Sequence, residues 1–149
     1  MLVMGLIATA IINLAIGTFT DTATITNRRD VYEEGKTAMD RLAKQLRQGE
    51  SVNTTLSTSS TVVFSTYINN VASTVAWRAQ GSSAPYQLQE SRNGGTTYDT
   101  VVDALSSPAV FTYTTHGGVL DQVTIDLSLV TTTSTVHLQS DVYLRNAQS

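Results

Sequence analysis

The stretch MLVMGLIATAIINLAIGTFT, residues 1–20, runs directly into DTATITNRRDVYEEGKTAMDRLAKQLRQG, residues 21–49, and together these decide the expected fold. The first stretch carries no charged side chain. As a helix, about 19 apolar residues at roughly 1.5 Å each approach the hydrocarbon thickness of a bilayer. A secretory signal peptide would begin with basic residues, whereas the first basic residue here is Arg28. We therefore expect residues 1–20 to form a helix that is retained and buried on all sides.

The second stretch is amphipathic rather than apolar throughout. Its apolar positions recur at helical spacing and form one narrow stripe, which we expect to pack on a sheet through Val31, Met39, Leu42 and Leu46. Charged side chains cover the opposite side, with Lys44 and Arg47 in the last turn, where cations complement the helix dipole. Because no proline separates the two stretches, the sequence predicts one helix of about 48 residues, roughly 70 Å long.

Beyond Gly49 the sequence changes to short segments rich in Thr and Ser, which favour the solvent face of a sheet. Apolar and polar residues alternate through 120–130 and again through 135–145, so these segments are expected to form a hairpin around residues 131–134. Earlier strands are expected at 61–67, 75–79, 86–90, 98–102 and 109–114. Asn and Gly pairs mark the turns between them.

These patterns predict an α+β fold. A long N-terminal α-helix, apolar in its front half and amphipathic in its back half, would pack on an antiparallel β-sheet. The helical part would span residues 1–49, divided into a membrane or filament-core segment (1–20) and a sheet-packing segment (21–49). Residues 50–149 would form the Thr/Ser-rich globular β-sheet domain.

The sequence offers no constellation for catalysis. There is no cysteine, which excludes disulfides, thiolate metal sites and thiol chemistry. The two histidines, His116 and His137, have no metal-ligand spacing to each other. We therefore expect no enzyme activity, no catalytic or metal-binding residues and no cofactor. The net charge of −3 gives no reason to expect nucleic-acid binding.

The order of parts resembles the type IV pilin superfamily, in particular its minor pilins and the J-type minor pseudopilins of type II secretion. Residues 1–8, MLVMGLIA, resemble the early pilin helix, with Gly5 at its recurrent glycine. Residues 38–48, AMDRLAKQLRQ, are similar to the helix end of the minor subunits, and residues 142–146, VYLRN, to their final strand. The resemblance implies a pilin-like fold. It also implies about nine further residues of pilin helix ahead of Met1.

The function that the resemblance implies is that of a structural subunit of a type IV pilus-like or secretion pseudopilus filament. The subunit would sit in the inner or cytoplasmic membrane before assembly, then polymerise outside it with copies of itself and other pilin-like subunits, helped by assembly machinery. The expected membrane or filament-core packing residues are Leu2, Met4, Gly5, Leu6, Ile7, Ile11, Ile12, Leu14 and Ile16. The expected inter-subunit charges are Arg28, Arg29, Glu33, Glu34 and Arg41.

Two other functions stay open on the sequence alone. A membrane-anchored extracellular binding module or adhesin would use a hairpin tip, such as residues 93–104 or 116–121, as its contact surface and would not polymerise. An anchored hydrolase would need a pocket with converging Asp and His side chains.

Overall fold

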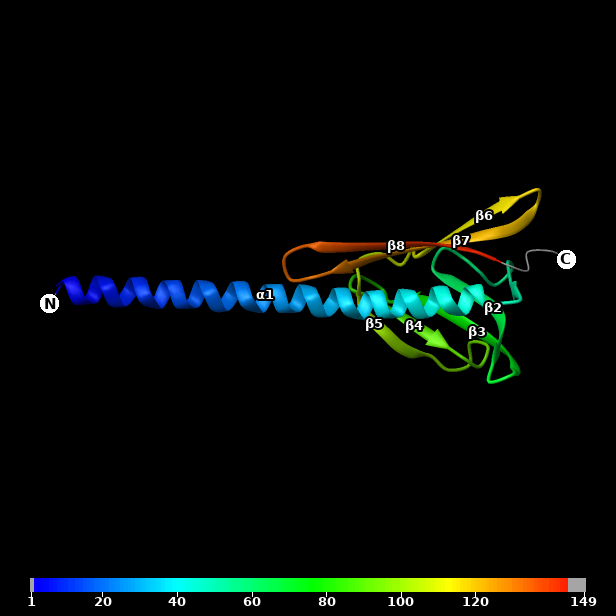
Figure 1. Cartoon of the computed structure of the whole chain (residues 1–149), viewed down its shortest axis with the longest axis horizontal. Coiled ribbons are helices and arrows are strands. Elements are labelled where there is room, and N and C mark those ends of the chain that lie inside the picture. The colour runs from blue at the N-terminus through cyan, green and yellow to red at the C-terminus, as the bar shows by residue number, and fades with distance from the viewer. Residues whose placement is uncertain (1, 145–149) are drawn as a thin grey trace.

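The computed structural model describes the backbone of residues 2–144 and the side chains of residues 25–144. The described residues form one helix and eight strands, joined by turns and loops. In chain order they are α1 (Leu2–Arg47), β1 (Ser51–Val52), β2 (Thr61–Ile68), β3 (Val71–Gln80), β4 (Tyr86–Ser91), β5 (Asp99–Leu105), β6 (Phe111–His116), β7 (Val119–Val130) and β8 (Thr135–Tyr143). Figure 1 shows the strands gathered around the C-terminal part of α1, while the N-terminal part projects beyond them.

The strands form one antiparallel sheet in the order β1-β2-β3-β4-β5-β7-β6, with β8 paired to β7. The sheet narrows to a single paired position between β5 and β7, Leu105 with Leu129. Beside it, the Ser106 amide donates to the Ser128 carbonyl at 2.7 Å. This narrow junction divides the sheet into two halves. In Figure 1, β8 and β6 lie on one side of the C-terminal part of α1, and β3, β4 and β5 lie on the other.

Turn chemistry fixes two of the hairpins. Asn69 and Asn70 join β2 to β3 with φ of 51° and 63°, and Gly117 and Gly118 join β6 to β7 with φ of 61° and 85°. Two successive positive φ values give the type I′ turn, which matches the twist of the flanking strands and favours Asn and Gly. The expected turns at both places are confirmed.

One hydrophobic core collects side chains from both halves of the sheet and from the helix. Trp77 and Phe64 are its largest fully buried side chains. Along β7 the alternating residues Val123, Ile125, Leu127 and Leu129 are all fully buried. The helix contributes Ala38, Met39, Leu42, Ala43 and Leu46.

The expected α+β fold class is wrong, because the fold is mostly β. Strands account for 51% of the fully described part of the chain and helix for 19%, so an eight-stranded sheet, rather than a long helix packed on a sheet, defines the fold. The physical reason is that the uninterrupted helical pattern dominates the sequence. In the short Ser- and Thr-rich segments, apolar and polar residues alternate only weakly. The sequence therefore predicts fewer strand residues than the structure contains.

The individual strands show where that pattern was weak. Strand β3 begins at Val71, whereas the sequence predicted a start at residue 75. The first four residues of β3 are not buried and show no alternation of apolar and polar residues, so the pattern did not indicate them. The two-residue strand β1 was not expected at all. By contrast, β7 and β8 lie within a residue or two of the expected 120–130 and 135–145.

The expected membrane or filament-core residues Leu2, Met4, Gly5, Leu6, Ile7, Ile11, Ile12, Leu14 and Ile16 lie outside the residues whose side chains are described. Within residues 25–144, no helix has the length and apolar character needed to cross a membrane.

Candidate functional site

A buried carboxylate connects the helix to the sheet. Glu90, in β4, is only 3% exposed and pairs with Arg41 of α1 and with Arg92, the latter at 3.1 Å. Gln45, one helical turn beyond Arg41, donates its amide to Glu90 Oε1 at 2.8 Å. The same Gln45 accepts the indole N–H of Trp77 at 2.8 Å. Both oxygens of a buried carboxylate therefore have charged partners, which is the condition under which a buried charge is tolerated.

A pocket of about 320 Å³ opens beside this network. Three cationic side chains line it, Arg41, Lys44 and Arg92, together with Tyr67 near the end of β2. The Tyr67 side chain is 55% exposed at the rim. The location of the pocket follows from the fold, since the last turns of α1 and the β2–β3 hairpin supply most of its lining. The pocket can accept an anion.

A second hollow, of about 410 Å³, lies where the helix leaves the sheet. Ile25, Tyr32 and Val136 supply its apolar lining, and Arg28 and Arg29 supply its charges. Ile25 is 69% exposed and Tyr32 is 41% exposed. Large apolar side chains exposed together next to polar ones are typical of a surface that contacts another molecule.

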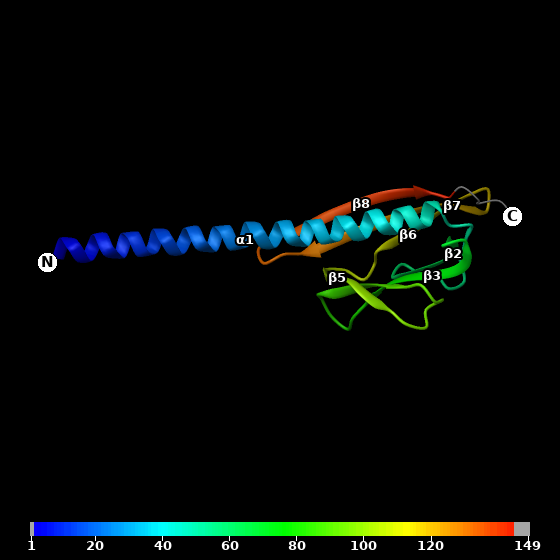
Figure 2. The ribbon, with the colours of Figure 1, turned by 60° about the horizontal axis from the view of Figure 1, so that its bottom comes forward.

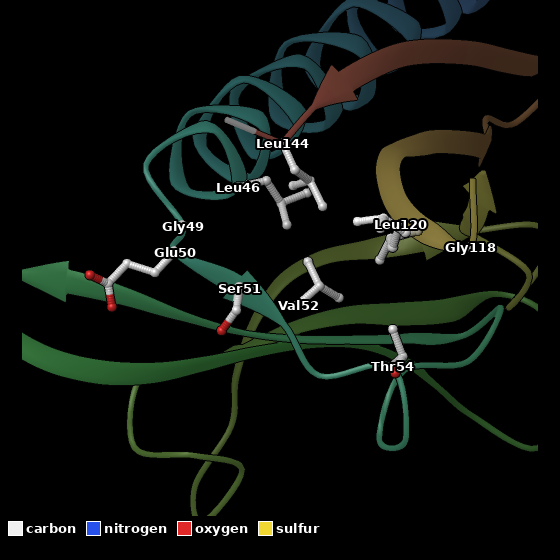
Figure 3. A pocket seen from close by; sticks show the side chains of 10 residues that line it. Leu46, Gly49, Glu50, Ser51, Val52, Thr54, Gly118, Leu120 and Leu144 are labelled. Atoms are coloured by element: carbon white, nitrogen blue, oxygen red, sulfur yellow. The ribbon is translucent and has the colours of Figure 1, made fainter. Parts of the chain in front are cut away.

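A third pocket, of about 230 Å³, lies below the C-terminal end of α1. Figure 3 shows Leu46, Val52, Leu120 and Leu144 pointing into it from the helix, β1, β7 and the end of β8, while the Glu50 carboxylate points away. The side chains that converge in this pocket are apolar. They supply no acid, base or nucleophile for catalysis.

The four residues expected to pack against the sheet belong to the core or its edge. Met39, Leu42 and Leu46 are buried, and Val31 packs against the core while partly exposed. Gly35, in the same stripe, lies against β7, because a Cβ built on it would sit 2.2 Å from Leu129 Cδ1.

The residues expected to form inter-subunit charges have different surroundings. Arg29 pairs with Glu33 along the exposed helix at 2.9 Å, and Arg28 lines the hollow described above. Arg41 is engaged within the chain by Glu90. Glu34 lies near Asp103 of β5; partial burial, and secondarily the Asp103 charge, raise the pKa of the Glu34 carboxyl.

The histidines remain apart, each with its own partner. His116 Nδ1 lies 2.5 Å from Asp121 Oδ2, and His137 Nδ1 lies 2.8 Å from the Ser128 hydroxyl. Within residues 25–144, no group of three His, Asp or Glu side chains is arranged to hold a metal ion.

Sequence reasoning missed the Glu90 network. Glu90 falls at the end of an expected strand, where period-two alternation places it on the same face as buried Leu88, but its charge favours an exposed position. A second signal lies in the helix, because Arg41 and Gln45 stand four apart and so share a face.

No family model, curated protein or solved structure matches the chain.

Proposed function

We propose that this chain is a structural subunit of a filament of the type IV pilus or type II secretion pseudopilus kind. The subunit is held in the membrane by its N-terminal helix before assembly, and it polymerises through that helix into an extracellular or periplasmic filament. Its partners are copies of itself, related subunits and an assembly machinery. Its role is packing rather than catalysis.

The observation that carries the proposal is the projecting part of α1. The helix runs from Leu2 to Arg47, and in the described chain it packs mainly against β8, β7, β5 and β2. Both views show its N-terminal half extending beyond all of these strands (Figures 1 and 2). The sequence of that half carries no charge through residue 20. An apolar helix outside its own domain needs lipid or other helices around it, and both environments bury it on all sides.

The hollow at the base of this projection gives further support. Ile25 and Tyr32 extend an apolar surface from the projecting helix onto the flank of the β domain. A neighbouring subunit's helix, packed along the projection, would cover that surface. Arg28 at its margin is available for an ion pair with an acidic group of the neighbour, whereas Arg29 already pairs with Glu33.

The absence of cysteine from the chain makes the proposal directly testable by cross-linking. The double variant Ile7→Cys/Ile16→Cys places thiols nine residues apart, on opposite sides of the helix. The full-length variant is reconstituted into lipid vesicles at falling protein-to-lipid ratios and oxidised. A polymerising subunit is expected to give a ladder of covalent oligomers that persists on dilution with lipid.

A matched control carries the same change elsewhere. The double variant Ser82→Cys/Thr115→Cys places two thiols at exposed positions of the β domain, outside the helix. This control is expected to stay monomeric. If the helix variant gives only monomers, or dimers that vanish on dilution, the chain does not polymerise through its helix, and the anchored binding module becomes the better interpretation.

A further inference from the structure

We propose that the basic pocket between the end of α1 and the β2–β3 hairpin binds an acidic saccharide, with its carboxylate held by Lys44, Arg41 and Arg92. This ligand site goes beyond the filament role and does not depend on it. A subunit, or an anchored module, would carry the same pocket on its β domain.

The first argument is preorganisation. Arg41 and Arg92 both bind Glu90, whose side chain is 97% buried, so their guanidinium groups are fixed in the pocket wall before any ligand arrives. Arg41 is further positioned over the Trp77 ring, 5.8 Å from its centroid. Groups already held in place lose little conformational entropy on binding, which raises affinity.

The second argument is charge. Three cations line or enter the pocket and one carboxylate, Glu90, lies behind it, so the local charge is about two positive units. Arg92 reaches Glu90 through Nε, which leaves the two terminal nitrogens of its guanidinium as donors. In the described part of the chain, no acidic group forms an ion pair with exposed Lys44. Guanidinium and ammonium donors of this kind bind carboxylates through strong, charge-assisted hydrogen bonds.

The third argument separates a sugar from a bare anion. At about 320 Å³, the pocket is at the small end of the range for small-molecule sites, so it suits a single sugar ring. Tyr67 offers an exposed aromatic face, which attracts the partly positive C–H groups of a pyranose. Gln48 and Asn69, also in the lining, supply amide donors and acceptors for hydroxyl groups.

The test is a titration of the ¹⁵N-labelled full-length chain in detergent with sodium glucuronate, followed by amide chemical shifts. Trp77 is the only tryptophan, so its indole N–H gives one resolved signal next to Gln45 and Arg41. We expect saturable shifts of this signal and of amides in residues 41–48, 66–70 and 90–92. Glucose, the uncharged counterpart, is expected to cause none of them.

Two substitutions locate the site. Lys44→Gln removes a cation that makes no contact with Glu90, and it is expected to weaken glucuronate binding about tenfold. Arg47→Gln removes a cation from the same helical turn that does not line the pocket, and it is expected to leave binding unchanged. Tyr67→Ala, an exposed position, is expected to weaken glucuronate binding without affecting the fold.

Four results would overturn the proposal: the absence of saturable shifts, equal binding of glucose, an equal effect of the Lys44 and Arg47 variants, and sodium sulfate binding as tightly as glucuronate. The last would reduce the pocket to a simple anion site. Tighter binding of the dipeptide acetyl-Glu-Glu-amide would instead assign the pocket to an acidic protein partner. Because the titration uses detergent-dispersed chain, its outcome is independent of polymerisation.

Discussion

At the scale of single residues, Glu90 is held by contacts from two parts of the chain. It places a negative charge in an almost fully buried position and satisfies it with Arg41, Gln45 and Arg92, which come from the helix and from the end of β4. Such a network contributes less to net stability than to the alignment of the helix with the sheet, since an ion pair loses hydration when it is buried. It fixes how the helix lies against the half of the sheet formed by β1 to β5.

Replacing Glu90 with Gln is expected to destabilise the domain by about 2 kcal/mol. The amide keeps the shape but leaves Arg41 and Arg92 without their counter-ion, although both are partly exposed and regain some hydration. Urea unfolding of the full chain in detergent, followed by Trp77 emission, measures the change. Glu33→Gln, which breaks only the exposed pair with Arg29, is the control and should leave the midpoint unchanged. Equal midpoints for both variants would show that the network is dispensable.

Glu34 makes stability depend on pH in a predictable direction. Partial burial, with a smaller effect from Asp103, raises the pKa of the Glu34 carboxyl in the folded chain. The folded state therefore holds the proton more tightly than the unfolded state. The contribution of Glu34 to stability is fully present below its ordinary pKa and is lost as the pH rises through the raised value.

Glu34→Gln is therefore expected to raise the urea midpoint at pH 7, well above the ordinary pKa of the carboxyl. The difference should diminish as the pH falls below that ordinary value. Measuring unfolding midpoints across this pH range checks the sign. A destabilising effect at pH 7 would mean that the Glu34 carboxylate makes a favourable contact in the fold.

At the scale of elements, the contact between α1 and β7 depends on the smallest residue of the helix stripe. A Cβ at Gly35 would approach Leu129 Cδ1 to 2.2 Å and Leu138 Cδ1 to 3.1 Å. Leu129 is fully buried, so moving its side chain aside disturbs the close-packed core. Glycine therefore allows the helix and strand to approach closely here without that displacement.

Gly35→Ala is expected to make the protein less stable by about 1 kcal/mol. Overpacking costs about 1–3 kcal/mol, and the better helix propensity of alanine returns up to about 1 kcal/mol. Comparing Lys36→Gly with Lys36→Ala, at the adjacent exposed position, measures the propensity of Gly against Ala without overpacking, and the Ala variant should be the more stable of the two. Unfolding midpoints of the Gly35 variant and of these two controls give the comparison. A Gly35 variant as stable as wild type would show that the helix can shift away from β7.

The elements also show how far the sequence alone can lead. Strong period-two alternation placed β7 and β8 almost to the residue, and the Asn-Asn and Gly-Gly pairs placed two turns. The predicted fold class was wrong because strands such as β3 bury only part of their length, so alternation understated how much sheet there is. The local sequence pattern also does not predict that β5 and β7 share only one paired position, since these strands are distant in the sequence.

The pocket was less predictable than the strands. Lys44 and Arg41 were visible as charges on a helix, but Tyr67 and Arg92 come from hairpins far along the chain. Only the fold brings them to the same place. Alternation places Glu90 on the face of Leu88, but burial of its charge could not be predicted, because the charge that makes burial tolerable lies 49 residues away on Arg41.

At the scale of the whole molecule, the core and the projecting helix are separable. Among residues 25–144, every buried residue of the hydrophobic core lies between Ala38 and Val142. The C-terminal part of the helix completes this core, while the N-terminal part extends beyond the sheet (Figure 1). The domain's stability and its proposed assembly therefore reside in different parts of one continuous helix.

A variant that begins at Ile25 tests this division. Because all core residues are retained, we expect it to fold, with Trp77 as shielded from solvent and the same urea midpoint as the full chain in detergent. Without residues 1–24 it should sediment as a monomer in the absence of detergent, whereas the full chain should associate. Analytical ultracentrifugation and Trp77 emission give the two measurements. A folded variant that still forms large assemblies would locate the association surface on the β domain, and an unfolded one would show that the N-terminal half of the helix contributes to the domain's stability.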